Sequence, residues 1–295
     1  MAGCATTSST TTCECPTPSA DTEEPAEELP IVVRAIDTHV HVYFAPDTAD
    51  QVSAERPPSD DAVQKLLDDS RLHHIGVVVI ASEDFEDARA QNDALLAFTA
   101  TDPRLFPIAS VHPRHGEQGL DEIRRVAEAG AKMIKIHQNT QDFDLEDPGV
   151  ADVIAAATDA GLPVLLEGTM VMDPNTVGKV LMLAISHPES RLVMAHMGGI
   201  DFRQMKTFAM LEEYPWWPRN IWYDISWTVS AVADSPLREE FVWMVRQLGV
   251  DRVMFGSDFP MATPESALSA LETLGLDADE LDAVSYGTAA ELLDL

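Results

Sequence analysis

The sequence predicts a single (β/α)8 barrel of the TIM type over residues 31–295, an α/β fold, preceded by a disordered N-terminal tail over residues 1–30. Two observations lead to this prediction. Eight apolar, β-branched runs alternate with amphipathic segments from residue 31 onward. These units occupy 295 − 30 = 265 residues, close to the usual size of about 250 residues for such a barrel.

The eight runs predict parallel strands because they are continuously apolar, which is typical of a sheet that is covered on both faces. An open, doubly wound sheet is the structural alternative, but no Gly-rich phosphate loop follows the first run. The predicted strands are 31–35, 75–81, 106–111, 132–136, 162–166, 192–195, 221–225 and 253–255.

Amphipathic patterns between these runs predict helices over 59–73, 88–100, 120–129, 150–160, 174–186, 239–248 and 264–274. Start and stop signals support several of them, with Ser59 and Asp60 before a run, Gly130 and Gly161 after one, and Pro174 and Pro264 in first turns. Three histidines, His73, His74 and His187, are expected to close helices, where a cation suits the helix dipole.

The tail over residues 1–30 is rich in Ser, Thr, Pro and Glu and carries too few large apolar side chains to form a core. Its opening, Met1-Ala2-Gly3-Cys4, resembles the end of a bacterial lipoprotein signal, in which small residues precede a lipidated cysteine. We therefore expect a lipid anchor at Cys4, with the tail as a linker at the cell envelope. The charged and apolar parts of a signal peptide are missing, so a cytoplasmic location is the alternative.

Composition limits the classes of partner. With 19 basic and 50 acidic residues the net charge is −31, which repels nucleic acid. No apolar run approaches the roughly 20 residues that span a bilayer. All three cysteines lie within the first fifteen residues, so the barrel needs no disulfide or thiolate site. The expected partner is a small-molecule substrate, and self-association is left open.

In this fold the chemistry gathers at the carboxyl ends of the strands. The polar residues predicted there are His39, His41, Glu83, His112, Arg114, His137, Glu167, His196, Asp224 and Asp258. Side chains alternate along a strand, so Asp37, His39 and His41 are expected to share one face. Two imidazoles on one face can chelate a metal.

The chain resembles the amidohydrolase-related branch of the amidohydrolase superfamily. The segments that carry the resemblance are Asp37-Thr38-His39-Val40-His41, Lys135-Ile136-His137, Ala195-His196-Met197-Gly198-Gly199, Tyr223-Asp224-Ile225-Ser226 and Phe255-Gly256-Ser257-Asp258-Phe259-Pro260. They extend over residues 35–260, which is essentially the whole predicted barrel.

This resemblance implies one divalent metal, zinc or alternatively manganese. Its expected ligands are His39, His41, Glu167 and Asp258, and the expected catalytic residues are Asp258 as base and His196 as proton donor or acceptor. The remaining rim residues His112, Arg114 and His137 are expected to bind substrate. Glu167 departs from the family, which usually has histidine there, and two nitrogens with two carboxylates make a harder, less zinc-selective set.

The expected activity is hydrolysis of a small amide, ester or lactone by a metal-activated water. One alternative is non-oxidative decarboxylation of an aromatic or unsaturated acid on the same site. Another is a metal-free binding module at the cell envelope, for which Glu167 is the evidence. Lys135 is expected to pair with a rim acid, with a carboxylated, two-metal lysine as the alternative. The tryptophans Trp216, Trp217, Trp222 and Trp227 are expected to serve in packing, or alternatively to wall an aromatic pocket.

Overall fold

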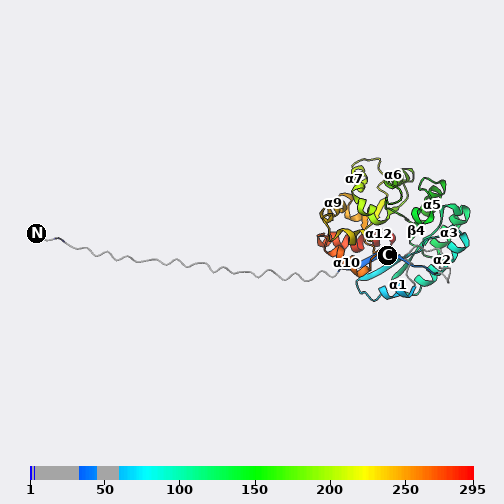
Figure 1. Ribbon diagram of the computed structural model, residues 1–295, viewed down its shortest axis with the longest axis horizontal. Coiled ribbons are helices and arrows are strands. Elements are labelled where there is room, and N and C mark those ends of the chain that lie inside the picture. Colours follow the sequence, from blue (N-terminus) through cyan, green and yellow to red (C-terminus); the bar gives the residue numbers. More distant parts are fainter. Residues whose placement is uncertain (2, 4–32, 45–59) are drawn as a thin grey trace. The chain divides into compact units, whose positions relative to one another are not determined.

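The computed structural model describes residues 1, 3, 33–44 and 60–295 and contains an eight-stranded, all-parallel sheet in the order β1 to β8. Contacts divide the chain into Met1–Ile31 and Val32–Leu295. Apart from residues 1 and 3, the predicted tail and its Cys4 anchor lie outside the described residues. The strands curl into a TIM barrel, which confirms the predicted fold class (Figure 1).

The predicted number of strands is present, with seven of them overlapping their predicted ranges and the first shifted along the chain, and their side chains are buried on both faces almost throughout. The strands are β1 (Ala35–His41), β2 (Leu72–Val78), β3 (Leu105–Ser110), β4 (Met133–Ile136), β5 (Val164–Leu166), β6 (Leu192–Met194), β7 (Ile221–Asp224) and β8 (Val253–Met254).

Helices surround the sheet in chain order, so each strand is followed by a helical layer that covers its outer face (Figure 1). They are α1 (Asp60–Leu66), α2 (Phe85–Thr99), α3 (Glu117–Glu128), α4 (Gln138–Gln141), α5 (Pro148–Asp159), α6 (Thr176–Ser186), α7 (Lys206–Leu211), α8 (Thr228–Val232), α9 (Arg238–Leu248), α10 (Pro264–Glu272), α11 (Ala278–Asp282) and α12 (Thr288–Leu293). Further helical segments are η1 (Pro113–His115), η2 (Ala195–Met205), η3 (Val250–Arg252) and η4 (Ala283–Gly287), and the backbone of η2 is interrupted by non-helical residues from His196 to Gly199. No helix in the described part of the chain is both long and apolar enough to cross a membrane.

Backbone hydrogen bonds join β1 to the segment that follows β8 and so close the barrel. The amide of Thr38 donates to the carbonyl of Phe255 (3.1 Å), and the amide of His41 donates to the carbonyl of Phe259 (2.9 Å). In the opposite direction, the amide of Asp258 donates to the carbonyl of His39 (2.8 Å). The same contacts hold the β1 histidines beside Asp258.

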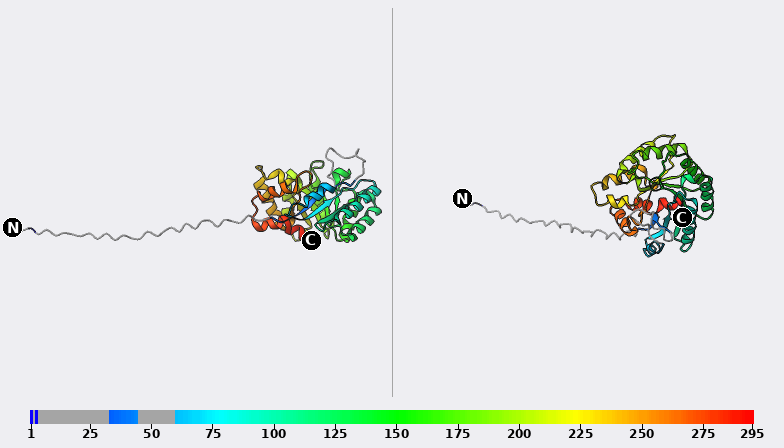
Figure 2. Two further views of the ribbon diagram at one scale, coloured as in Figure 1. Left: turned by 90° about the horizontal axis from the view of Figure 1, so that it is seen from below. Right: turned by 45° about the vertical axis from the view of Figure 1, so that its right-hand side comes forward.

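The apolar residues form two separate clusters, one between strands and outer helices and one inside the barrel. On β4, for example, Ile134 and Ile136 belong to the outer cluster, whereas Met133 belongs to the inner one. Helix α12 completes the inner cluster with Ala289, Leu292 and Leu293. It lies within the ring of helices in the view of Figure 1, while Figure 2 shows the barrel from two other directions. The barrel interior is therefore filled with side chains at its α12 end.

Three local predictions were wrong. Pro174 does not lie in the first turn of a helix, because α6 starts at Thr176 with Asn175 as its N-cap. The first strand was predicted over 31–35, but Val33 and Arg34 are not in a strand and β1 starts at Ala35 and carries both histidines within it, while residues 31 and 32 lie outside the described residues. The helix predicted over 59–73 stops at Leu66, and His73 and His74 lie in β2 rather than at a helix end. A turn intervenes, in which the Asp69 carboxylate accepts a hydrogen bond from the amide of Arg71 (3.0 Å). By contrast, His187 does cap a helix, α6, as predicted.

Candidate metal centre

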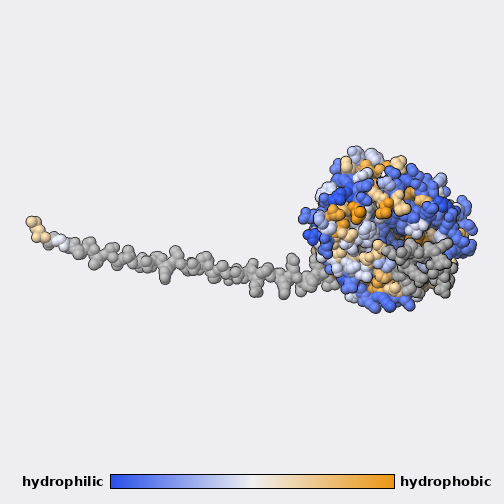
Figure 3. Space-filling model, in the orientation of Figure 1, coloured by the Kyte–Doolittle hydropathy of each residue, from blue (hydrophilic) through white to orange (hydrophobic). Residues whose placement is uncertain are grey.

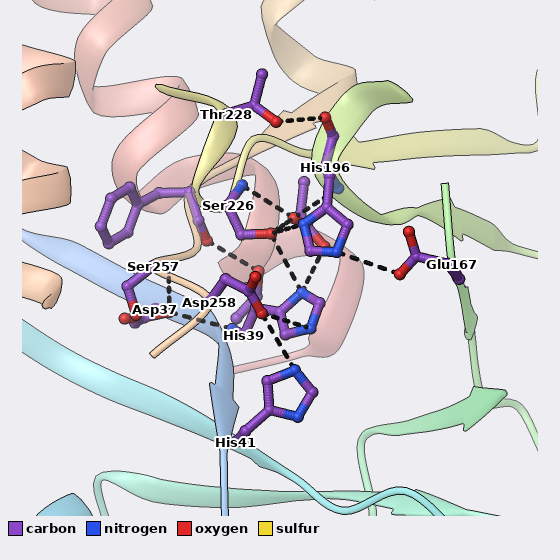
Figure 4. Close-up of polar contacts among 12 residues, drawn as sticks. Asp37, His39, His41, Glu167, His196, Ser226, Thr228, Ser257 and Asp258 are labelled. Atoms are coloured by element: carbon purple, nitrogen blue, oxygen red, sulfur yellow. Dashed lines mark hydrogen bonds and ion pairs between the residues drawn. The ribbon is translucent and has the colours of Figure 1, made fainter. Parts of the chain in front are cut away.

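Strand register brings the predicted rim residues to one level. Leu166 of β5 pairs with Ile136 of β4 and with Met194 of β6. Polar side chains follow these apolar positions directly or after one residue, namely His137, Glu167 and His196. Figure 4 shows Glu167 and His196 reaching toward the histidines of β1. Side chains that are far apart in sequence thus converge because parallel strands end at the same edge.

Strand β1 departs from regular alternation between Asp37 and Val40. Asp37 pairs with Ile75 and Val40 pairs with Val77, so three steps along β1 match two along β2. This irregularity is braced by Asp37, whose Oδ1 accepts hydrogen bonds from the amides of His39 (3.1 Å) and Ser257 (2.9 Å). The predicted convergence of His39 and His41 is present despite this irregularity, because both rings face Asp258, whereas Oδ1 of Asp37 accepts from backbone amides.

His39 is completely buried and has the environment of a metal ligand. Its Nδ1 lies 3.1 Å from Oδ2 of Asp224, whereas its Nε2 has no hydrogen-bond partner among the described residues. Burial lowers the pKa of His39 by more than the negative charge of Asp224 raises it. The neutral form of the ring is therefore favoured. A neutral imidazole with one nitrogen on a carboxylate and a free lone pair on the other fits a divalent metal.

Asp258 lies next to both histidines of β1. Its Oδ1 is 3.1 Å from Nε2 of His41 and 3.6 Å from Nε2 of His39. Burial raises the pKa of Asp258, but the hydrogen bond from His41 and the nearby His39 and His196 outweigh it and bring the pKa to about 2. Asp258 is therefore an ionised carboxylate that faces two imidazole nitrogens.

Glu167 contacts two other histidines. Its Oε2 lies 3.3 Å from Nε2 of His196 and 3.4 Å from Nε2 of His137. Its Oε1 accepts hydrogen bonds from Thr169, from the amide at 2.9 Å and from the hydroxyl at 2.6 Å. Burial acts to raise the pKa of Glu167, but the neighbouring His196, His137 and Lys135 hold it well below its ordinary value. Glu167 is thus a buried, oriented anion.

His196 is the cation that pairs with Glu167. Burial lowers the pKa of His196, but the charge and hydrogen bond of Glu167, together with Asp258 and Asp224, raise it to about 9. Its Nδ1 lies 2.8 Å from the hydroxyl oxygen of Ser226. His196 therefore carries a proton at neutral pH in the metal-free protein. His137 differs, because burial outweighs the attraction of Glu167 and lowers its pKa to about 3.

Two residues behind the histidines had no role assigned from sequence. Oδ2 of Asp224 contacts Nδ1 of His39. Oδ1 of Asp224 accepts hydrogen bonds from the backbone amides of His196 (3.1 Å) and Ser226 (3.0 Å). The Ser226 hydroxyl also donates to Asp224. These contacts orient His39 and His196 together. The sequence feature that could have indicated the role of Asp224 is its position as an acidic residue at the end of a buried strand, within the motif 223–226.

The structure brings the four predicted ligands and His196 into one network, in which the ligand atoms of His39, His196 and Asp258 all lie within 4.8 Å of one another. His41 joins this cluster through Asp258, and Glu167 joins it through His196. The ligand role of Glu167 remains a prediction. Figure 4 shows these contacts as dashed lines.

The predicted substrate residues His112 and Arg114 lie in a different environment. Nε2 of His112 lies 2.7 Å from the carbonyl of Gln141, and its Nδ1 accepts from the amide of Arg114 (3.0 Å). The Arg114 guanidinium donates to the carbonyl of Asp142 (2.7 Å). Both side chains thus brace the loops after β3 and α4. Among the described residues neither side chain contacts the carboxylates of the network directly, and His112 is linked to His137 only through Gln141, whose Oε1 accepts from the amide of His137 (2.7 Å). His137 itself contacts Glu167.

The prediction that Lys135 pairs with a rim acid was wrong. Its side chain is completely buried, and Nζ has neither a hydrogen bond nor an ion pair within the described residues. No carboxylate oxygen of the described residues therefore comes within pairing distance of this amine.

Trp227 is the tryptophan that lies beside the centre. Its ring is 6.0 Å from that of His196, and its backbone has φ 33°. A Cβ at Gly199 (φ 64°) would come within 3.2 Å of the indole, so glycine is required for this close approach. For two other tryptophans the packing interpretation is confirmed, because Trp217 packs against Phe208 and Trp222 lies under the guanidinium of Arg252.

Loops that follow the strand ends expose apolar side chains around the centre. Val171 and Met172 follow β5, Ile200 follows β6 and Met261 follows β8, and all four are more than half exposed. Figure 3 shows hydrophobic residues gathered on part of an otherwise hydrophilic surface. Buried charged side chains at the strand ends are thus accompanied by exposed apolar side chains in the loops that follow.

A family model described as "Amidohydrolase" matches residues 36–295. Solved structures share the fold at low identity. A dihydroxybenzoic acid decarboxylase from Polaromonas sp. JS666, with bound manganese and 2-nitroresorcinol, is 15% identical with a TM-score of 0.65, covering 89% of this chain and 97% of that one. A 5-carboxyvanillate decarboxylase from Sphingomonas paucimobilis is 18% identical with a TM-score of 0.66, covering 89% and 99%.

A protein assigned as a 2-pyrone-4,6-dicarboxylic acid hydrolase from Acinetobacter baumannii, with citric acid bound, is 17% identical with a TM-score of 0.66. The match covers 89% of this chain and 100% of that one. Comparison with curated protein sequences gives no significant match. Hydrolases and decarboxylases thus share this fold, so the fold does not separate the two reactions.

Proposed function

We propose that this chain, which belongs to the amidohydrolase family, is a divalent-metal-dependent hydrolase of a small amide, ester or lactone. The observation that carries the proposal is the free Nε2 of His39, completely buried, facing Asp258 and supported on its other nitrogen by Asp224. An unpaired buried imidazole nitrogen is costly, and a metal ion would satisfy it.

In this proposal His39, His41 and Asp258 hold the metal and Glu167 completes the ligand set. When bound, the ion would lower the pKa of a water to about 7 and polarise a substrate carbonyl. Two nitrogens and two carboxylates suit zinc or manganese. Manganese is bound by the decarboxylase from Polaromonas, which makes it a specific candidate here.

The side chains then divide the proton transfers between them. Asp258 is ionised and accepts the proton of the attacking water. His196, which carries a proton in the metal-free protein and lies 3.3 Å from Glu167, would donate a proton to the leaving group. Asp224 keeps the Nδ1 proton of His39 in place, so that Nε2 stays free.

Decarboxylation of an aromatic or unsaturated acid is the second candidate. It is favoured by Trp227, whose indole lies next to His196 and could stack on a planar substrate. In this reaction the carbon–carboxylate bond breaks, carbon dioxide leaves, and the proton of His196 goes to the carbon that held the carboxylate. The same residues serve both reactions, so the products must distinguish them.

The test is to purify the full chain from cells grown with zinc and manganese and to measure its metal content by elemental analysis. We expect about one equivalent of divalent metal. The purified protein is then assayed with 2-pyrone-4,6-dicarboxylic acid and simpler lactones for hydrolysis, and with dihydroxybenzoic acids for carbon dioxide release.

The variants H39A and D258N should lose metal and activity while keeping the parent circular dichroism, because rim residues contribute little to the barrel core. H187A, at the end of α6, is the matched control and should retain both. Only trace metal in the parent protein would overturn the proposal and favour the binding module. Carbon dioxide release without hydrolysis would select the decarboxylase.

A further inference from the structure

Thr169, in the loop that follows β5, holds one carboxylate oxygen of Glu167 with two hydrogen bonds. Oε1 of Glu167 accepts from the backbone amide of Thr169 at 2.9 Å and from its hydroxyl at 2.6 Å. Each oxygen of a carboxylate offers about two lone pairs to hydrogen-bond donors or to a metal. Both lone pairs of Oε1 are therefore in use within the protein.

The second oxygen of Glu167 has different neighbours. Oε2 lies 3.3 Å from Nε2 of His196 and 3.4 Å from Nε2 of His137. Figure 4 shows the carboxylate of Glu167 with one oxygen directed toward His196. The two oxygens are thus divided between the loop and the centre, and Oε2 is the one that faces the histidines.

The backbone of Glu167 is held as firmly as its side chain. Nε2 of Gln138 donates to the carbonyl of Glu167 (2.8 Å). A Cβ added at Gly168 would collide with the backbone carbonyl oxygen of Ala195, so the chain packs closely against β6 directly after Glu167. An exchange of Oε1 and Oε2 would have to break both hydrogen bonds to Thr169, because the backbone leaves the carboxylate little room to move.

The side chain of Thr169 also has a fixed orientation. A Cβ added at Gly199 would lie 3.5 Å from Cγ2 of Thr169, so the methyl group of Thr169 lies over the backbone of η2. A β-branched side chain has few rotamers. With the methyl group placed against Gly199, the hydroxyl is directed to Glu167.

We infer that Thr169 is a positioning residue that limits Glu167 to a single oxygen, Oε2, for contact with the metal. The inference rests on the metal site of the proposed function and deepens it, because the number of oxygens supplied affects which ion is preferred. Zinc favours four ligands, whereas manganese favours six, mostly oxygens. Thr169 therefore favours zinc over manganese at this site.

The test compares T169V with the parent protein. Valine keeps the branched shape and the backbone amide, but it removes the hydroxyl and so frees one lone pair of Oε1. Affinities for Zn²⁺ and Mn²⁺ are measured on the full chain at neutral pH by competition with a fluorescent chelator. We expect the ratio of the Kd for Mn²⁺ to the Kd for Zn²⁺ to fall at least about tenfold in T169V, within the range known for residues behind a metal ligand.

Two control variants separate this role from a general loss of order. T169S keeps the hydroxyl and should keep the ratio of the parent. T158V removes a hydroxyl from α5, where it donates to the helix carbonyl of Ile154 (2.7 Å), and should also keep the ratio. If the hydroxyl of Thr169 only stabilised the loop, T169V would bind both ions more weakly by the same factor. An unchanged ratio in T169V would therefore overturn the inference.

The metal-loaded parent provides a test that does not depend on the folding of T169V. A crystal structure of the parent with Zn²⁺ or Mn²⁺ should show Glu167 in contact with the ion through Oε2 alone, with Oε1 still held by Thr169. Contact through both oxygens, or through Oε1, would overturn the inference while leaving the proposed function intact. Failure of the proposed function differs, because the parent would then bind neither ion and the inference would fall with it.

Discussion

His39 and Asp224 are 185 residues apart in sequence, yet Nδ1 of His39 lies 3.1 Å from Oδ2 of Asp224 with both side chains buried. This contact joins the first strand to the seventh across the interior of the barrel. It decides which nitrogen of His39 carries the proton, and hence which nitrogen is free to bind a metal.

We predict that D224N weakens metal binding by about 10- to 100-fold, the usual effect of removing a carboxylate behind a ligating histidine. An amide cannot accept from His39 and from two backbone amides at once, so the ring loses its fixed tautomer. Chelator competition with Mn²⁺ or Zn²⁺ measures the change. D251N, at an exposed surface carboxylate, is the control, and equal affinity in D224N would rule out the orienting role.

Glu167 gives a second prediction. E167Q should bind metal at least about tenfold more weakly than the parent, because a neutral amide is a poorer ligand for a hard cation. E167H should preserve binding and shift the preference toward zinc, since imidazole is the softer donor. Competition between Zn²⁺ and Mn²⁺ in the parent and both variants checks this. If E167Q binds as tightly as the parent, Glu167 serves only to keep His196 charged.

The pH dependence of stability should report on His196. Its pKa of about 9 in the folded metal-free protein exceeds its ordinary value of 6.5, so the stabilisation is full below pH 6.5 and is lost as the pH rises through 9. The unfolding free energy of the parent minus that of H196Q should therefore fall across this range, by about 3 kcal/mol at most. Urea unfolding of both proteins without metal gives the measurement. A difference that stays constant with pH would contradict the ion pair with Glu167.

Gly168 should tolerate no side chain. A Cβ at this position would lie 1.9 Å from the backbone carbonyl oxygen of Ala195, so the loop that follows Glu167 would have to move. We expect G168A to lose at least about 2 kcal/mol of unfolding free energy and to weaken metal binding.

Gly178 of α6 is the matched control for this substitution, because nothing lies within 4 Å of its added Cβ. G178A should be neutral or gain about 0.5–1 kcal/mol, as expected for alanine in place of glycine within a helix. Urea unfolding compares the two variants with the parent. A G168A protein as stable as G178A would show that the loop has room to adjust.

The barrel itself was predictable from sequence because its signals are local. Continuous apolar runs indicate strands that are covered on both faces, and a glycine or proline marks the end or the start of several helices. Gly130 and Gly161 follow α3 and α5 with φ of 99° and 71°, and Pro264 opens α10, as predicted. The parallel order of the strands then places His39, Glu167, His196 and Asp258 at one edge of the barrel.

The pairing of these groups was decided by tertiary structure alone. The register of β1 breaks between Asp37 and Val40, where Asp37 holds backbone amides, and a sequence pattern with period two cannot show such a break. Likewise, only the closed barrel brings Glu167 to His196 and leaves the Lys135 amine without a hydrogen-bond partner among the described residues. Distances between strand ends depend on register and closure, and these are set by the packing of the whole sheet rather than by any one segment.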